Sequence, residues 1–243
     1  GPGGRAIDPE TGNEVMSFIV SGATNPNPDL KWESNQEVNF GIDFGIFNSR
    51  LSGSIELYRR TVVDLIYPFQ VPVPPNKQPR TLANSGSIRN QGIEITAQYY
   101  VITKPSLKWK TLLTFSSNDQ KTIALGDNGN FKLGEIPTLY VSGRGLVGGI
   151  NNAQVIRTGL SVGTFVMPEY AGLSSDGKFL FYTKEGGVTR DVSKAERRVV
   201  GSAQPKFQAG WSNFFNFGNF DASIAFRTII GYDLLNVTKM MFS

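Results

Sequence analysis

Four carboxylates are the residues of this chain whose type and spacing could do chemistry. Pairs of carboxylic acids cleave glycosidic bonds when one donates a proton and the other acts as base or nucleophile. Each of the four, however, occupies a polar position in a segment of alternating polar and apolar residues. A hydrated wall with a network of mixed charges explains the same pattern, and we favour it. The carboxylates are Asp43, Glu56, Glu94 and Asp221, and the basic residues in similar positions are Lys108, Lys110, Lys206 and Arg227.

The composition excludes most other kinds of active site. Without cysteine, the chain has no disulfide, no cysteine-ligated zinc and no thiol nucleophile. Without histidine, it lacks the commonest general base and metal ligand, which excludes triads and most zinc sites. The 24 basic and 20 acidic residues are scattered, unlike the basic patch of a nucleic-acid-binding protein. We therefore expect no enzyme, cofactor or nucleic-acid partner, and we assign no catalytic, cofactor, metal or ligand residue.

One glycine motif resembles a dinucleotide-binding fingerprint. Gly143-Arg144-Gly145-Leu146-Val147-Gly148 fits the pattern G-x-G-x-x-G, which requires a strand before it and a helix after it. Residues 137–141 could form the strand, but the glycines and asparagines at 148–152 are a poor start for a helix. We interpret the motif as a flexible, glycine-rich loop.

Two further groups lie in the same glycine-rich region. The segment Arg190–Arg198 could form one short capped helix. A solvated charged surface is its simplest interpretation, and contact with anionic lipopolysaccharide or a partner protein is the alternative. Aromatic rings can stack on sugars, but they can equally pack a loop onto itself or onto a partner. The aromatic residues concerned are Tyr170, Phe179, Phe181 and Tyr182.

The elements that position the charged residues are segments in which apolar and polar residues alternate. Every even position of Glu37–Ile46 is apolar and every odd position is polar or glycine, so a strand here has one apolar and one polar face. Five further segments behave similarly, and short turns join the six in pairs. In the third segment the apolar face consists of Ile93, Ile95, Ala97, Tyr99 and Val101. The predicted strands are Gln36–Ile46, Leu51–Ile66, Gln91–Ile102, Leu107–Asn118, Lys206–Phe215 and Asn219–Gly231.

The connections between these strands are alternately short and long. Long segments span about 67–90, which holds five prolines, and about 119–204. Short turns at one end and long loops at the other are typical of an outer-membrane β-barrel, whose tilted strands cross the hydrocarbon in roughly 9–11 residues. A soluble β-sheet, such as a carbohydrate-binding module, explains the alternation but not this asymmetry. Aromatic residues expected at a membrane interface lie near the short turns: Phe47, Tyr99, Trp109, Phe215 and Phe220.

The chain also lacks the sequence features of other membrane segments. It contains no apolar run of about 18 residues, and its first residues do not resemble a signal peptide. We expect it to begin and end within a longer polypeptide. We divide it into a loop and barrel entry at 1–35, a part of a barrel at 36–231, and the start of the next loop at 232–243.

An ordered set of motifs extends this interpretation. The motifs are Asn27–Glu33, Gly41–Ile55, Asn84–Ile95, Gly159–Gly163 and Pro205–Phe207. Together they resemble the C-terminal part of the barrel in SusC/RagA-type TonB-dependent outer-membrane transporters of Bacteroidetes. The resemblance covers most of the chain, from Asn27 to Asn236, and it is the order and spacing of the motifs that make it specific.

The resemblance implies an all-β fold, namely about six strands of an antiparallel transmembrane barrel of about 22 strands with long extracellular loops. It implies a multi-pass protein of the cell outer membrane, in contact with lipid and lipopolysaccharide. It also implies a SusD-like surface lipoprotein as partner, and energy supplied by TonB through a segment not in this chain. The plug domain of the family is absent from these residues as well, and six strands cannot close around so wide a lumen.

The expected function is therefore part of an active importer of large nutrients, either oligosaccharides or peptides. The alternative is a SusC-like barrel that acts as a structural scaffold in a surface or secretion complex. The sequence names no substrate.

Overall fold

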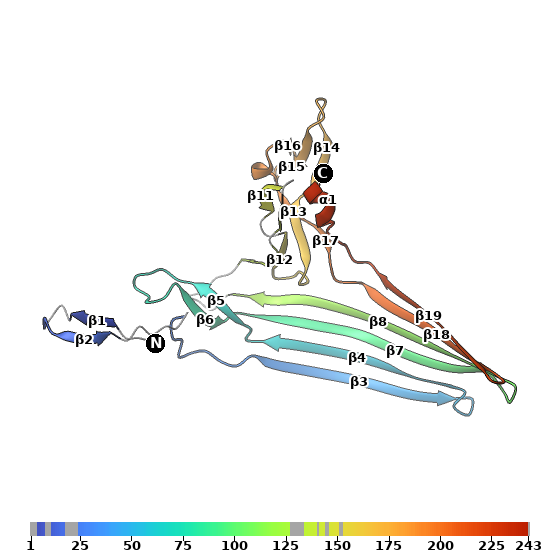
Figure 1. Cartoon of the computed structure of the whole chain (residues 1–243). Coiled ribbons are helices and arrows are strands. Elements are labelled where there is room, and N and C mark those ends of the chain that lie inside the picture. The colour runs from blue at the N-terminus through green and yellow to red at the C-terminus, as the bar shows by residue number, and fades with distance from the viewer. Residues whose placement is uncertain are drawn as a thin grey trace.

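A large antiparallel sheet dominates the structure, a computed structural model that describes residues 4–7, 11–17, 24–126, 134–139, 141–143, 146–150 and 153–242. Its strand order is β19-β18-β8-β7-β4-β3 (Figure 1). The predicted all-β class is confirmed. The strands are β3 (Ser34–Ile46), β4 (Leu51–Val63), β7 (Gly86–Lys104), β8 (Leu107–Leu125), β18 (Phe207–Phe217) and β19 (Phe220–Ile230).

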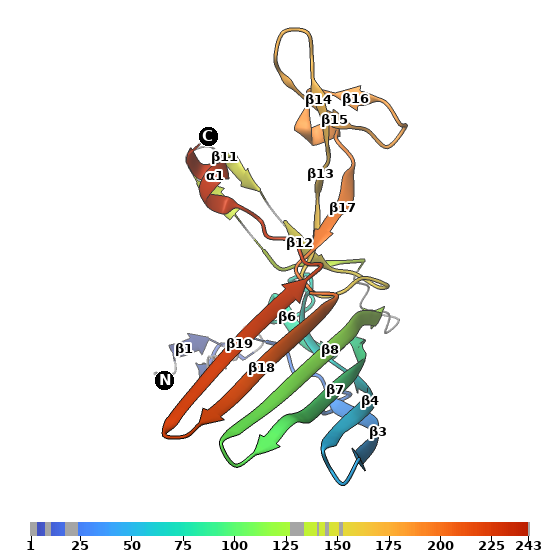
Figure 2. The ribbon, with the colours of Figure 1, turned by 90° about the vertical axis from the view of Figure 1, so that its right-hand side faces the viewer.

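The three tight turns of this sheet lie at one end, and the remaining chain rises from the other end (Figures 1 and 2). Phe47, Asn48 and Ser49 close the β3–β4 turn with φ of 55°, 56° and 59°, a left-handed conformation that asparagine tolerates better than most residues. Gly218, with φ of 59°, begins the β18–β19 turn. That turn is shorter than expected, because β18 continues through Phe217.

The strand register preserves the alternation across all six strands. Because paired residues place their side chains on the same face, one face of the sheet is polar and the other is apolar. One polar row reads Asp43, Ser54, Thr96, Thr114, Gly210 and Arg227, and the adjacent apolar row reads Phe44, Gly53, Ala97, Leu113, Trp211 and Phe226.

The predicted apolar face of the third strand is wrong at Val101, because β7 contains a β-bulge there. Tyr100 pairs with Lys110 and Ile102 pairs with Trp109, so Val101 has no partner. Beyond the bulge, Ile102 rather than Val101 therefore continues the apolar face. The Arg50 guanidinium donates to the carbonyl oxygens of Tyr100 and Val101 at 2.8 and 2.7 Å, which provides a partner for the carbonyl that the bulge removes from the ladder.

Other strand boundaries also differ from those expected. β7 begins at Gly86 rather than Gln91, and β8 continues to Leu125 rather than ending at Asn118. β4 ends at Val63 rather than Ile66, because Asp64 takes a left-handed conformation with φ of 57°. β7 and β8 therefore extend into the segments that the sequence suggested were loops.

The long connections are folded rather than irregular. The first contains the hairpin of β5 (Ile66–Gln70) and β6 (Arg80–Asn84). The second contains a four-stranded sheet in the order β17-β13-β12-β9 and a three-stranded sheet in the order β14-β15-β16. The strands of these two sheets are β9 (Ile136–Pro137), β12 (Gln154–Ile156), β13 (Thr164–Pro168), β14 (Tyr170–Leu173), β15 (Phe179–Tyr182), β16 (Val188–Thr189) and β17 (Arg197–Ser202).

The buried apolar side chains also lie in these connections. Among the described residues, the buried apolar ones are Phe69, Ala83, Ala153, Val155, Phe165 and Val166. None of them belongs to the six-stranded sheet.

Three short elements complete the described structure. The hairpin of β1 (Gly4–Ile7) and β2 (Glu14–Ser17) lies in the stretch expected as loop, and α1 (Val237–Phe242) follows the last strand. The hairpin of β10 (Val141–Gly143) and β11 (Leu146–Ile150) contains the described residues of the glycine motif. A hairpin is not the strand-turn-helix unit of a dinucleotide site. No helix in the described ranges is long and apolar enough to span a membrane.

Candidate functional site

Three of the four candidate carboxylates lie close together on the polar face. Glu56 on β4 lies directly opposite Glu94 on β7, and Asp43 on β3 pairs with Ser54, two residues from Glu56. Like charges directly opposite each other on a sheet are destabilising. Within the described part of the chain, no ion pair or hydrogen bond neutralises these three groups.

The expected network with basic residues does not form. Lys110 places its ammonium 4.7 Å from the centre of the Phe214 ring, and Asp221 accepts a hydrogen bond from the Asn216 amide. Glu94 and Arg227 line the same hollow, of about 490 Å³, without an ion pair between them. The structure therefore confirms a polar wall of mixed charge, but the wall's charges are not satisfied by one another within the described residues.

The apolar face carries large side chains in the open. Val38 is 73% exposed and Phe40 is 60% exposed, and similar residues cover the rest of the face. Such a wide exposed apolar surface is unusual on a soluble protein. Other large apolar residues exposed there include Ile42, Ile46, Leu57, Leu113, Trp211, Ile224, Phe226 and Ile230.

Two hydrogen-bonded tryptophans lie on the apolar face. The Trp109 indole donates to the side-chain oxygen of Asn213 at 3.0 Å, and the Trp211 indole donates to the Thr111 hydroxyl at 2.8 Å. Trp109 also stacks on Phe215, with ring centres 5.5 Å apart. Asn213 is buried, so these bonds satisfy polar groups that this face would otherwise leave unpaired.

Two of the sequence motifs, Asn27–Glu33 and Asn84–Ile95, meet where the folded connections join the sheet, which we call the outer rim. Asn84 accepts a hydrogen bond from the Lys31 backbone N–H at 2.8 Å and donates to the Lys31 carbonyl at 2.8 Å. Asn27 donates to the Leu82 carbonyl, and Glu33 accepts from the Ile66 backbone N–H. These contacts fasten residues 25–33, which we call the entry segment, to the β5–β6 hairpin. The local sequence pattern of the two motifs does not indicate that they bind each other.

The motif Gly159–Gly163 joins the second long connection to the end of β8. The Thr122 backbone donates to Leu160 at 2.9 Å and accepts from Gly159 at 2.8 Å. The side chain of Gln120 accepts from the Val162 backbone at 3.2 Å. Gly159 and Gly163 have φ of 85° and 88°, which explains why the motif begins and ends in glycine.

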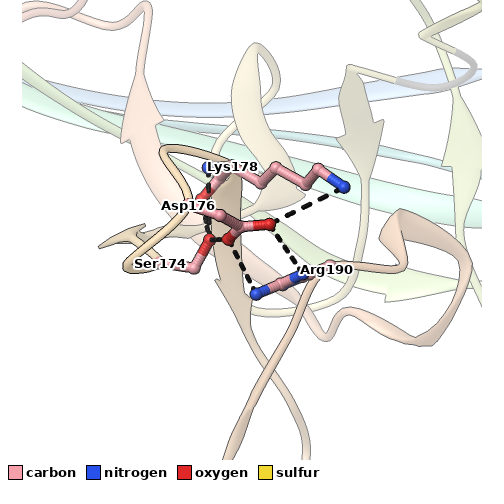
Figure 3. Close-up of polar contacts among 4 residues, drawn as sticks. All are labelled: Ser174, Asp176, Lys178 and Arg190. Atoms are coloured by element: carbon pink, nitrogen blue, oxygen red, sulfur yellow. Dashed lines mark hydrogen bonds and ion pairs between the residues drawn. The ribbon is translucent and has the colours of Figure 1, made fainter.

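The three-stranded sheet and the residues around it, 169–198, form what we call the outer arm. A charged network closes its hairpin: Asp176 accepts from Arg190 at 2.8 and 3.1 Å and from the Ser174 hydroxyl at 2.5 Å (Figure 3). Lys178 adds an ion pair with Asp176 at 3.7 Å (Figure 3). These contacts hold the tip of the outer arm in one shape.

The helix considered for Arg190–Arg198 is reduced to one 3-10 turn, Val192–Lys194. Asp191 caps the turn, and hydrogen bonds from the Ser193 side chain and backbone hold the pKa of its carboxyl below the ordinary value. A hydrogen bond to Glu196 raises the pKa of Arg198, whose guanidinium also lies 5.0 Å from the Tyr182 ring centre.

The candidate sugar-stacking aromatics are partly engaged with the outer arm itself. Tyr170 and Phe179 meet edge to face with ring centres 5.8 Å apart, and both side chains remain more than half exposed. Phe181 pairs with Tyr170 in the strand register. The geometry assigns none of them to a ligand.

Comparison with known proteins identifies the architecture. A family model described as "TonB dependent receptor-like, beta-barrel" matches residues 4–228. TonB-dependent receptor P3 of Formosa agariphila is 27% identical over 243 residues, covering 93% of this chain and 23% of that protein. TonB-dependent receptor SusC of Bacteroides thetaiotaomicron is 25% identical, covering 86% of this chain and 21% of SusC.

Solved structures agree on the fold. The RagAB peptide importer in the "open-open" state superposes with a TM-score of 0.73 at 24% identity, covering 95% of this chain and 24% of that one. This chain therefore spans about a quarter of the length of the proteins it matches. These relatives are receptors and importers rather than enzymes, and the SusC/RagA resemblance is confirmed. The chain belongs to the TonB-dependent receptor β-barrel family.

Proposed function

We propose that this chain is a part of the barrel wall of an outer-membrane importer of large nutrients. The observation that carries the proposal is the six-stranded sheet, which exposes an apolar face and a polar face and buries no apolar side chain of its own. In water such a sheet would gain little from folding, since hydrophobic burial is the main favourable term. In a bilayer the apolar face contacts hydrocarbon, and the polar face lines a hydrated lumen.

The edges of the sheet support the same proposal. β3 and β19 are its outermost strands, and each leaves a row of backbone donors and acceptors without a strand partner. In lipid these groups must pair with further strands, because an open edge is not tolerated there. The rest of the barrel therefore comes from polypeptide beyond the present residues, which account for only 23% of the length of a relative such as receptor P3.

The cargo and partners are inferred from relatives. RagAB is described as a peptide importer, so a peptide is the first cargo to test and an oligosaccharide the second. We further propose that a SusD-like lipoprotein covers the outer end, and that TonB supplies energy through a segment outside this chain. The folded connections at the outer rim provide the surface that such a partner would meet.

The test uses the full-length protein in its own outer membrane. We expect it to need detergent for extraction, to migrate differently on a gel before and after heating, and to import labelled peptide or oligosaccharide only when TonB is present. Solubility without detergent would refute the barrel. A membrane barrel that assembles a surface complex but imports no cargo of either class would favour the scaffold alternative.

A further inference from the structure

A hollow lies on the polar face of the sheet, close to the short turns. It has a volume of about 690 Å³ and is formed between β7, β8, β18 and β19. The side chains that give it its chemistry are Tyr100, Lys108, Lys110, Phe214, Asn216 and Asp221.

The charges of this hollow are unbalanced. The Lys110 ammonium lies over the Phe214 ring, and Lys108 pairs with Asn216 in the register. Asp221 is the carboxylate of the hollow, but it is bound by the Asn216 amide. No ion pair between described residues joins it to either lysine. Among the described residues, neither the Lys108 nor the Lys110 ammonium group thus has an acidic partner, and that of Lys110 lies over an aromatic ring.

The spacing of the two lysines fits an anionic segment. Residues two apart on a strand lie on the same face, roughly 6.5–7 Å apart. A carboxylate between them, or one carboxylate on each, would form charge-assisted hydrogen bonds. The rings of Tyr100 and Phe214 would meanwhile cover the apolar part of the same segment.

We propose that the hollow seats an acidic segment of the same polypeptide, from the part that fills the lumen. This inference rests on the proposed function. A barrel as wide as those of the outer-membrane transporters has a plugged lumen, and about three quarters of a relative such as receptor P3 lies outside the region matched here. The residues that line the hollow lie near the short turns. Those turns are at the end of the sheet opposite the folded connections (Figure 2), so incoming cargo would reach the hollow last.

The experiment places a photo-crosslinking amino acid at position 214 of the full-length protein and identifies the products by mass spectrometry. We expect a cross-link to a peptide of the same polypeptide that lies outside these 243 residues and contains Asp or Glu. The same probe at position 226, on the apolar face, is the matched control and should label lipid instead. The double variant Lys108→Glu and Lys110→Glu should reduce the cross-link at least about tenfold. Replacing the acidic residues of the cross-linked peptide with lysine in that double variant should restore the cross-link.

Three outcomes would overturn the inference in a protein that is folded in the outer membrane. They are the absence of an intramolecular cross-link from position 214, a cross-link to a separate protein, and a cross-link that appears only with added cargo. Membrane location and heat-modifiable migration are measured on the same sample. Failure of those two measurements would instead refute the proposed function.

Discussion

Replacing Asn84 tests whether the motifs at the outer rim are a structural fastening. Its amide forms hydrogen bonds with the Lys31 N–H, the Lys31 carbonyl and the Asp64 carbonyl at 2.8, 2.8 and 2.7 Å. A hydrogen bond contributes about 0.5–1.5 kcal/mol net, and the lower end applies to groups near solvent. Asn84→Ala removes the two bonds to Lys31, so it should destabilise the attachment of the entry segment by about 1 kcal/mol. The detached population should rise roughly fivefold, since about 1.4 kcal/mol corresponds to a factor of ten.

Limited trypsin digestion measures this directly, because the entry segment contains a trypsin site at Lys31. When opening is fast relative to cleavage, the cleavage rate follows the open population, so cutting after Lys31 should accelerate by the same factor in Asn84→Ala. Asn84→Asp keeps the acceptor for the Lys31 N–H and should give an intermediate rate. Asn76→Ala, which removes a bond to the Pro72 carbonyl inside the neighbouring connection, should leave the rate unchanged. An unaltered cleavage rate in Asn84→Ala would refute the reasoning.

Three other predictions follow from the sheet and the outer arm. Trp109→Phe and Asn213→Leu should each destabilise the barrel in detergent by about 1–3 kcal/mol. The double variant should cost less than their sum, and strict additivity in denaturant titrations would contradict the indole bond. Gly92→Ala places a carbon 2.3 Å from a backbone oxygen of the adjacent strand, so we expect a lower unfolding temperature by heat-shifted gel mobility. Gly41→Ala, with its nearest neighbour at 3.6 Å, should have little effect. Because the pKa of Asp191 is lowered in the folded protein, its cap should be fully present above pH 3.8 and be lost as the pH falls through the lower folded value. An NMR titration of this residue that follows a free aspartate would disprove this.

The alternation of side chains was sufficient to predict the six long strands and their two faces. The reason is physical, since each face meets a different environment and every second residue must suit it. The bulge at Val101 was not predictable, because the run from Tyr99 to Ile102 consists of four large residues with no alternation to interrupt. The small sheets of the connections were missed because strands of two to six residues are too short to show a period.

On the polar face, the sequence predicted the positions of the charged residues but not their contacts. Its carboxylates were placed correctly on one wall, with Glu56 opposite Glu94. The expected network with the basic residues does not form. Arg227 shares a row with Asp43, but the two lie on opposite edge strands of the sheet, and Lys110 lies over the Phe214 ring. The contact between Asn84 and Lys31 joins residues 53 positions apart, a distance over which local sequence pattern carries no information.

The location of the buried residues means that the outer connections and the six-stranded sheet depend on different solvents for their stability. The outer connections contain their own small cores around Val155, Val166 and Phe69, so water alone can drive their folding. The six-stranded sheet has no such core, and in the proposed barrel it obtains its stabilisation from lipid and from neighbouring strands. Urea should therefore unfold the outer connections while the barrel stays folded. A detergent that strips lipid should weaken the barrel while surface epitopes on the outer arm survive.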